Sequence, residues 1–252
     1  MIRIRDLHKS FGPNRVLRGV NLDIEAGHTT TIIGGSGSGK SVLFKHIIGL
    51  LKPDAGSVTV DGVNICALKE RELYGVVGKF GMVFQGGALF DSMTVGENVA
   101  FGIRQGREGG EPGIDIEAVV ERSLEHVGLP QVAHLLPAEL SGGMKKRVAI
   151  ARAIAKQPSI LMFDEPTTGL DPIMADVINE LIIKVSASSE ITAIVITHDM
   201  VSAYKISDKI AVLYEGEIIE TGTVAEIRNS KSEIVRQFIE GRAAGPIQVG
   251  LK

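Results

Sequence analysis

The sequence is poor in cysteine and in aromatic side chains, and it has no strong excess of one charge. Its 252 residues include one cysteine, no tryptophan and 4% aromatic residues, with a formal net charge of −3. The single cysteine, Cys66, excludes an intramolecular disulfide and a cysteine-based metal cluster, so we interpret it as a small apolar filler in a reducing compartment. The slightly acidic balance gives no global basic field, and no nucleic-acid partner is expected.

Long apolar runs are missing as well. The opening "MIRIRDLHKSFG" lacks the apolar stretch of a signal peptide, and no run approaches the roughly 20 apolar residues of a membrane-spanning helix. We therefore expect a chain that is soluble by itself and that a partner could hold at a membrane. The 44% hydrophobic content suffices for one large domain, with or without a subdomain.

Short apolar stretches alternate with helical patterns, which predicts an α/β fold. "TTTIIGG", "SILMFDE" and "ITAIVITH" are bare apolar strands of the kind buried in a parallel sheet. We predict a single domain with a β-rich opening, and its parts are a core at 1–87 and 158–225, a helical subdomain at 88–157, and a C-terminal helix and tail at 226–252. The glycine-rich stretch "RQGREGGEPGID" is interpreted as an exposed loop of that subdomain.

The stretch "GGSGSGKS", residues 34–41, fits the phosphate-loop pattern G-x-x-x-x-G-K-[ST] between an apolar strand and a helix. Its backbone N–H groups and the helix amino terminus would bind phosphate oxygens. Lys40 is predicted to reach the β- and γ-phosphates of ATP, and Ser41 to hold Mg²⁺. The predicted ATP-binding residues here are Gly34, Gly35, Ser36, Gly37, Ser38, Gly39, Lys40, Ser41 and Val42.

Polar residues follow three other apolar stretches. "ILMFDE" ends in Asp164 and Glu165, at the sheet edge where open α/β folds bind ligands. Asp164 is a predicted Mg²⁺ partner together with Ser41 and Gln85, whose carbonyl could reach the metal or the attacking water. Glu165 is predicted to orient or deprotonate that water. His198, in "THD", is the second predicted catalytic residue, near the γ-phosphate.

A second anion-binding loop, "LSGGMKKR", occupies residues 140–147. Two such loops on different parts of one chain predict that two copies pack head to tail. Ser141, Gly142 and Gly143 of each copy would then cap the γ-phosphate held by the other copy. ATP would hold this dimer together, and hydrolysis would loosen it.

In this order, "GGSGSGKS", "MVFQ", "LSGGM", "ILMFDE", "GLD" and "THD" resemble the nucleotide-binding subunit of an ABC transporter over nearly the whole chain. The resemblance implies a RecA-like P-loop core, ATP hydrolysis with Mg²⁺, a D-loop through Asp171 and a switch histidine. It also implies that Phe11 stacks on the adenine. Met144 departs from the commoner glutamine of the signature loop, but Ser141 and its two glycines are intact, so activity is expected to survive.

Three further stretches, "ELSGGM", "FQGGALFDSMTVGENVAF" and "VRQFIEGRAAGPI", resemble the ATPase of Mla-type, MCE-associated lipid transporters of Gram-negative envelopes. This implies phospholipid cargo moving between inner and outer membranes, and a place at the cytoplasmic face of the inner membrane through a permease homodimer. A periplasmic MCE-domain protein and a STAS-domain protein are the further partners it suggests. Leu89, Phe90 and Met93 are expected to receive the permease, and the tail after Phe238 to pack on the neighbouring ATPase.

Other functions remain open on these residues. Within the ABC family, the cargo could instead be amino acids, organic anions or lipoproteins. A soluble ABC ATPase acting on nucleic acid or in cofactor assembly is disfavoured by the acidic charge and the single cassette. A P-loop kinase would leave "LSGG" without a role.

Overall fold

A computed structural model describes residues 1–105, 115–187 and 191–248. The chain forms two compact units, Met1–Lys69 with Val195–Lys252 (unit 1) and Glu70–Ile194 (unit 2), and each is described by itself. Among the described residues, no helix is long and apolar enough to cross a membrane. The predicted glycine-rich loop falls mainly on residues 106–114, which lie outside the described residues.

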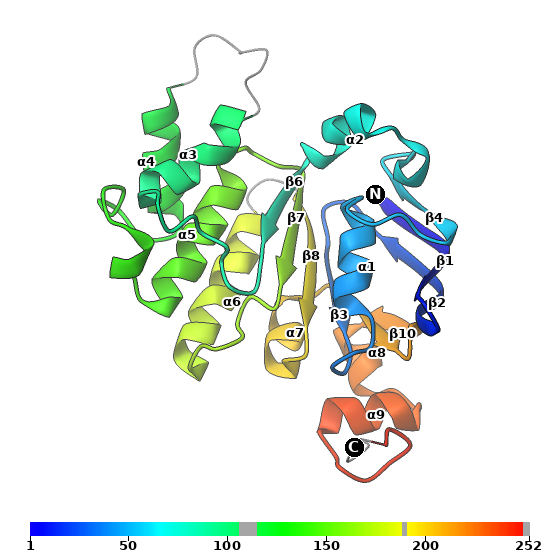
Figure 1. The fold of residues 1–252 in the computed structure, drawn as a ribbon. Helices are drawn as coiled ribbons and strands as arrows, with labels where there is room; N and C mark the ends of the chain where they lie inside the picture. Colours follow the sequence, from blue (N-terminus) through cyan, green and yellow to red (C-terminus); the bar gives the residue numbers. More distant parts are fainter. Residues whose placement is uncertain (106–114, 188–190, 249–252) are drawn as a thin grey trace. The chain divides into compact units, whose positions relative to one another are not determined.

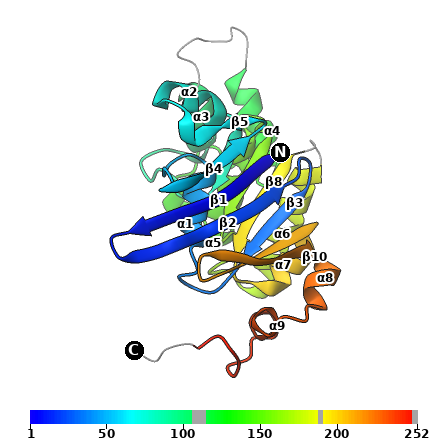
Figure 2. The same ribbon diagram turned by 90° about the vertical axis from the view of Figure 1, so that its right-hand side faces the viewer.

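Unit 1 contains a four-stranded antiparallel sheet in the order β2-β1-β4-β5. Ile2 and Ile4 are fully buried while Arg3 and Arg5 between them are exposed, so β1 has one face on the core. The predicted β-rich opening is thereby confirmed, and Figure 2 shows β1 and β2 as a long two-stranded ribbon. The strands are β1 (Ile2–Phe11), β2 (Asn14–Ile24), β4 (Ala55–Val60) and β5 (Val63–Asn64).

Unit 1 also contains the run β10-β9-β3 of a second sheet, in which β3 and β9 are parallel. All five residues of β3 are buried, as expected for a parallel strand covered on both faces. The predicted hairpin joins β9 to β10, and its turn residues Glu215 and Gly216 both have positive φ, which suits a tight hairpin turn. The elements are β3 (Thr29–Ile33), β9 (Lys209–Tyr214), β10 (Glu217–Thr223), α1 (Lys40–Ile47), η1 (Ile65–Ala67), α7 (Met200–Ile206), α8 (Val224–Arg228) and α9 (Glu233–Glu240).

Unit 2 places the parallel strands β6 and β7 side by side, with β8 next to β7. Helices α3, α4 and α5 pack against one another (Figure 1). They fall within the predicted helical subdomain, whose boundaries at 88 and 157 stay a prediction. The elements are α2 (Glu70–Val77), β6 (Phe80–Val83), α3 (Val95–Gln105), α4 (Ile116–His126), η2 (Pro137–Glu139), α5 (Gly142–Ile154), β7 (Ile160–Asp164), α6 (Pro172–Ala187) and β8 (Thr192–Thr197), which continues into unit 1.

Candidate functional site

The phosphate loop, residues 34–41, connects β3 to α1 in unit 1, as the sequence predicted. Gly37 and Gly39 have φ of 77° and 105°, a region in which only glycine is unstrained. A Cβ on Gly34 would lie 2.3 Å from the carbonyl oxygen of Leu213, so this glycine is required for close approach to β9. Glycine at these positions lets the backbone curl tightly between strand and helix.

The phosphate loop fits an anion. A Cβ on Gly35 or Gly37 would meet no atom within 4 Å, so the loop is open on that side. The buried Oγ of Ser38 has no hydrogen-bond partner among the described residues. Lys40 Nζ donates to the carbonyl oxygens of Gly34 (2.7 Å) and Gly35 (2.9 Å), where phosphate oxygens would be stronger acceptors. The loop therefore offers donors that a phosphate would satisfy better than the protein does.

Phe11 lies on the hairpin that adjoins this loop. It ends β1, opposite Asn14, and is 48% exposed with Lys9 Nζ 5.6 Å from its ring centroid. Further along the same hairpin, Val16 packs against Gly39 of the phosphate loop. An exposed aromatic ring in this place can stack on a base, and adenine stacking stays a prediction.

His198 follows β8 directly and is exposed. The next residue, Asp199, holds the turn, because its carboxylate accepts hydrogen bonds from the backbone N–H groups of Val201 (3.0 Å) and Ser202 (3.3 Å) at the start of α7. The Asp199 N–H in turn donates to Thr197 Oγ1 at 3.0 Å. A rigid turn thus presents His198 at the strand end, where the sequence predicted it.

Unit 2 carries the two predicted carboxylates at the end of β7. Asp164 is the last residue of the strand, and Glu165 follows with φ of 49°. A non-glycine residue in this left-handed region is uncommon, and such residues occur at turns and at functional sites. Thr168 Oγ1 donates to Glu165 Oε2 at 3.0 Å, which fixes the direction of this carboxylate.

The signature loop forms the amino terminus of α5. Ser141 is its N-cap, and its Oγ accepts from the backbone N–H of Met144 at 3.3 Å. Any residue except proline supplies that backbone N–H, so methionine in place of glutamine costs this cap nothing. Ser141 and Gly142 are exposed, which leaves the positive end of the helix open to an anion.

Two predicted motifs touch each other in unit 2. Asp171 Oδ1 accepts from the backbone N–H groups of Ile173 and Met174, both at 3.0 Å, at the start of α6. Met174 then packs on the signature loop, since a Cβ on Gly143 would lie 2.4 Å from Met174 Cε. The D-loop helix and the signature loop are therefore in direct contact within one chain.

Lys146 is a site residue that the sequence analysis missed. Its side chain is 6% exposed, and Nζ donates to the main-chain oxygens of Gln85 and, at 3.3 Å, of Glu165. Burial lowers the pKa of the Lys146 amine, while the negative charges of Glu165 and Asp164 act in the opposite direction. In the sequence, the burial of Lys146 is indicated by helical spacing: it lies three residues after Gly143 and four before Ile150, and both are buried in α5.

The predicted permease-binding stretch is organised by Asn98, a second residue that sequence reasoning missed. Asn98 is fully buried. Its Oδ1 accepts from the Phe90 N–H, and its Nδ2 donates to the carbonyls of Phe90 and Met93. Phe90 is 41% exposed, with its ring centroid 4.6 Å from that of Phe101. Leu89 and Met93 are half-buried, so the stretch is ordered but incompletely covered.

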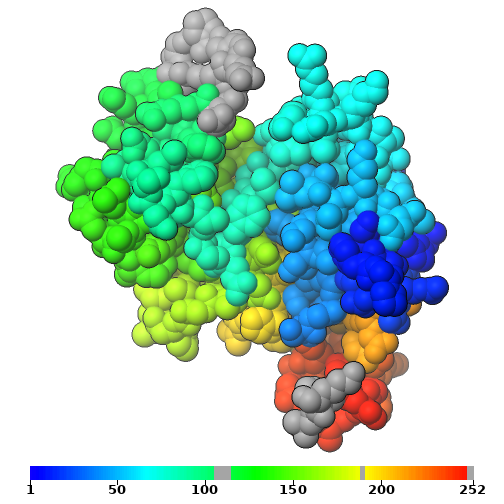
Figure 3. All heavy atoms as spheres, viewed as in Figure 1, coloured from blue at the N-terminus to red at the C-terminus, as the bar shows by residue number. Residues whose placement is uncertain are grey.

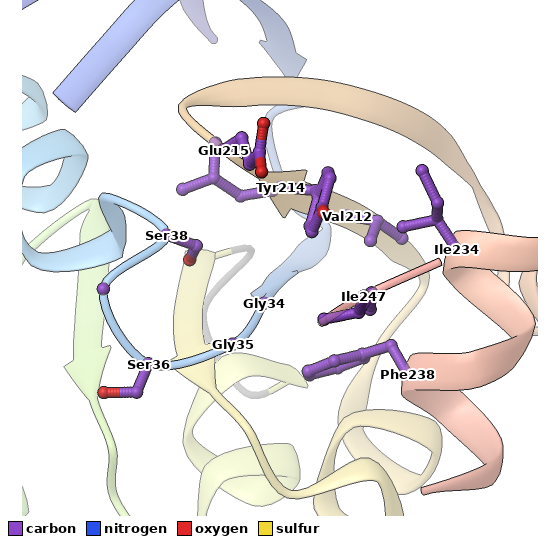
Figure 4. A pocket seen from close by; sticks show the side chains of 12 residues that line it. Gly34, Gly35, Ser36, Ser38, Val212, Tyr214, Glu215, Ile234, Phe238 and Ile247 are labelled. Carbon is purple, nitrogen blue, oxygen red and sulfur yellow. The ribbon is translucent and has the colours of Figure 1, made fainter. Parts of the chain in front are cut away.

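The tail has a structure that its composition did not predict. Gln237 of α9 is 4% exposed, donates to the carbonyls of Arg242 (3.2 Å) and Ile247 (3.0 Å), and accepts from the Ile247 N–H at 2.7 Å. Figure 4 shows Ile247 and Phe238 facing Gly34 and Gly35 across a cavity of about 180 Å³. Helix α9 and the tail appear in red at the surface of unit 1 in Figure 3. Contact with a neighbouring ATPase stays a prediction.

Comparison with known proteins gives a consistent result. The family model described as "ABC transporter" matches residues 17–168. The chain is 40% identical to the intermembrane phospholipid transport system ATP-binding protein MlaF of Haemophilus influenzae over 248 residues, covering 98% of this chain and 93% of that protein. It is 39% identical to the probable ribonucleotide transport ATP-binding protein mkl of Mycobacterium leprae, covering 98% of this chain and 70% of that protein.

A solved structure is similar as well. It is the dimeric ATP-binding cassette MJ0796 in a post-hydrolysis state bound to ADP and Pi, with a TM-score of 0.80 and 33% identity. The match covers 89% of this chain and 99% of that one. The predicted α/β P-loop fold is confirmed.

Proposed function

This chain belongs to the ABC transporter family, and from that premise we propose that it is the ATP-hydrolysing subunit of a transporter that moves phospholipid between the inner and outer membranes of a Gram-negative envelope. The chain is an ATPase of this family and binds ATP. The observation that carries the phospholipid cargo is the match to MlaF, which spans 98% of this chain and 93% of that protein.

A ribonucleotide cargo is the second candidate, because the mkl relative is nearly as similar. That match leaves 30% of mkl without a counterpart here, since it covers 70% of that protein. The two relatives thus differ in how much of their length this chain accounts for, and this difference favours the MlaF-like function. The remaining cargo classes, amino acids, organic anions and lipoproteins, have no support among these relatives.

In the proposed mechanism the phosphate loop binds the triphosphate, with Phe11 stacked on the adenine. Lys40 exchanges its two carbonyl acceptors for oxygens of the β- and γ-phosphates. Ser41, Gln85 and Asp164 have the oxygen donors that Mg²⁺ prefers, and the bound ion would neutralise charge that develops on the phosphates. The predicted roles of Ser36, Ser38 and Val42 are to complete the cradle around the phosphates.

Glu165 is the proposed residue that orients or deprotonates the attacking water, and Thr168 holds its carboxylate in place. His198 contacts the γ-phosphate from the end of β8. The same phosphate is capped by the signature loop of a second copy, through Ser141, Gly142 and Gly143. The D-loop of that copy, with Asp171, would lie at the same interface beside its signature loop. Loss of the γ-phosphate then removes the cap and loosens the dimer.

Cassettes of this family pair with each other and work with a membrane permease. The proposed partners here are a second copy of this chain, a permease homodimer, a periplasmic MCE-domain protein and a STAS-domain protein, with the chain held at the cytoplasmic face of the inner membrane. No nucleic-acid partner is proposed. The exposed ring of Phe90, on the stretch that Asn98 organises, is the proposed contact with the permease.

The trans cap is tested by trapping the ATP-bound dimer. Glu165→Gln should keep ATP binding, block hydrolysis and convert the chain from monomer to dimer when ATP and Mg²⁺ are added, as measured by size exclusion with light scattering. Adding Ser141→Arg should abolish the dimer. Ser232→Arg is the matched control, because Ser232 caps α9 in the same way through the Val235 N–H and lies outside the proposed interface. Dimers that persist with Ser141→Arg would contradict the trans cap.

The cargo is tested on the complex that this chain forms with its membrane partners. Phospholipid should stimulate its ATP hydrolysis, and ribonucleoside monophosphates added beside ATP should not. The reverse result would replace the phospholipid proposal with the ribonucleotide one. Phe90→Asp should abolish co-purification with the permease without changing ATP binding. Ile219→Asp, at a similarly exposed position on β10 (36% exposed), should leave co-purification unchanged.

A further inference from the structure

The helix that begins with the signature loop carries a buried charge that the mechanism above does not use. Lys146 of α5 is 6% exposed, although lysine is almost never fully buried without a partner. Its Nζ donates to two main-chain oxygens, one from Gln85 and one from Glu165. These acceptors are 61 and 19 residues away in the sequence, so one amine joins three separate motifs.

Both acceptors belong to residues with proposed roles at the γ-phosphate. Glu165 holds the left-handed backbone conformation that directs its side chain, with φ of 49°, and Lys146 donates to the carbonyl of this same residue. Such a conformation persists only where the surrounding structure enforces it. A hydrogen bond from a charged amine is one of the stronger constraints that a side chain can supply.

The same helix fastens the segment after Gln85 at a second point. Arg152 donates to the carbonyls of Gly87 (2.8 Å) and Ala88 (2.6 Å), and Ala88 also has a positive φ, of 45°. The segment 85–88 is therefore tied to α5 along two of its turns. Lys146 donates to both Gln85 and Glu165, so it is a link through which the position of α5 can set the backbone geometry of both residues.

We propose that Lys146 is a positioning residue, which holds the backbones of Gln85 and Glu165 in the arrangement that ATP hydrolysis needs and couples that arrangement to the helix of the signature loop. The proposal rests on the roles assigned above to Gln85 and Glu165. Lys146 acts through the main-chain oxygens of these two residues, and the proposal gives it no contact with the nucleotide. Its effect should therefore fall on turnover and not on ATP binding.

The test compares Lys146→Met, which keeps the length of the side chain but removes its donors, with Lys146→Arg, which keeps charge and donors. In the purified full chain, Lys146→Met should lower kcat on the order of a hundredfold, the size of effect expected from a small misplacement of reacting groups. The KM and the Kd for ATP should not change. Lys146→Arg should restore most of the turnover.

Lys184→Met is the matched control, since it removes the same charge and an exposed hydrogen bond to the main-chain oxygen of His126 in unit 2, and it should leave turnover unchanged. A second readout needs no activity. Hydrogen–deuterium exchange of Lys146→Met, relative to the unmodified chain, should rise in residues 84–88 and 165–168 and stay the same in α1. If Lys146→Met does not fold, Lys146→Gln, which removes the charge but keeps a neutral NH₂ donor group, is measured in its place.

Unchanged kcat together with unchanged exchange at both segments would overturn the proposal. The proposal would also be overturned if exchange rose uniformly across unit 2 and Lys146→Arg lost as much turnover as Lys146→Met. That pattern is expected of a residue with a general packing role. Glu165→Gln is measured in parallel. If Glu165→Gln stops hydrolysis while Lys146→Met does not, the positioning role fails alone; if Glu165→Gln hydrolyses ATP normally, the proposed function of Glu165 has failed first.

Discussion

At the scale of single residues, the buried side-chain amide of Asn98 makes four hydrogen bonds to the backbone of unit 2. It bonds Phe90 twice and also reaches the carbonyls of Met93 and Thr94 at 3.1 and 3.0 Å. Asn98→Ala would leave buried backbone groups without partners, so we expect a loss of about 2–4 kcal/mol in the free energy of unfolding. Urea denaturation measures this. Asn21→Ala, which removes two hydrogen bonds at an exposed site, should cost less than about 1 kcal/mol, and equal losses for the two variants would contradict the prediction.

His46 gives a residue-scale prediction about pH. It is buried in α1 with Nδ1 2.7 Å from the Val42 carbonyl, and burial lowers its pKa, with Lys9 acting in the same direction and Asp54 opposing. A folded-state pKa below the unfolded value of 6.5 means that the folded chain binds fewer protons, so stability should fall as the pH drops below about 6.5. The urea midpoint should therefore decrease from pH 7.5 to 5.5, and decrease less in His46→Leu. The exposed His134→Leu is the control, and identical pH profiles for the two variants would contradict this role of His46.

At the scale of elements, the sequence predicted those whose pattern is local. The apolar runs of β3, β7 and β8 and the turn at Glu215 and Gly216 could be predicted directly, because burial on both faces demands apolar residues and a tight turn with positive φ favours glycine. Helix α2 was not predicted, since it has no buried residue and so no apolar face to recognise. Strand β6 is harder to recognise in the sequence, because it is only four residues long and contains Gly81, which weakens a strand pattern.

The tail shows why a contact between distant side chains escapes a local pattern. Nothing in "RAAGPIQ" indicates structure, yet Gln237 of α9 holds Ile247 through two hydrogen bonds. Gln237→Ala should release the tail from the cavity beside the phosphate loop, and limited proteolysis should then cut within residues 242–248 much faster than in the unmodified chain. Glu240→Gln, which weakens only exposed ion pairs with Arg236 and Arg242, should keep the original cleavage rate. Equal cleavage of all three chains would show that Gln237 does not anchor the tail.

At the scale of the whole molecule, the motifs placed the candidate site but did not reveal what supports it. The phosphate loop, the end of β7 and His198 after β8 were predicted at strand ends, because a glycine loop and a strand-terminal carboxylate are recognisable from neighbouring residues alone. Lys146, Thr168 and Asn98 were not, since their partners depend on how unit 2 folds. The two glycine-rich loops belong to different units, and the proposed trans cap would be a property of a pair of chains.

That property predicts complementation between two inactive chains. Lys40→Ala removes the phosphate-binding amine and Ser141→Arg blocks the cap, so each variant alone should hydrolyse almost no ATP. In a mixed dimer, the phosphate loop of the Ser141→Arg copy meets the intact signature loop of the Lys40→Ala copy, and one complete site forms. The mixture is measured in the complex with the proposed permease homodimer, which would hold two copies together whether or not the caps form. Random pairing of equal amounts then makes half of the complexes mixed, each with one complete site of two, so the mixture should recover about a quarter of the original activity. Hydrolysis is measured at constant total protein. If the signature loop served its own chain, each copy would be inactivated by its own substitution, and the mixture would stay as inactive as its parents.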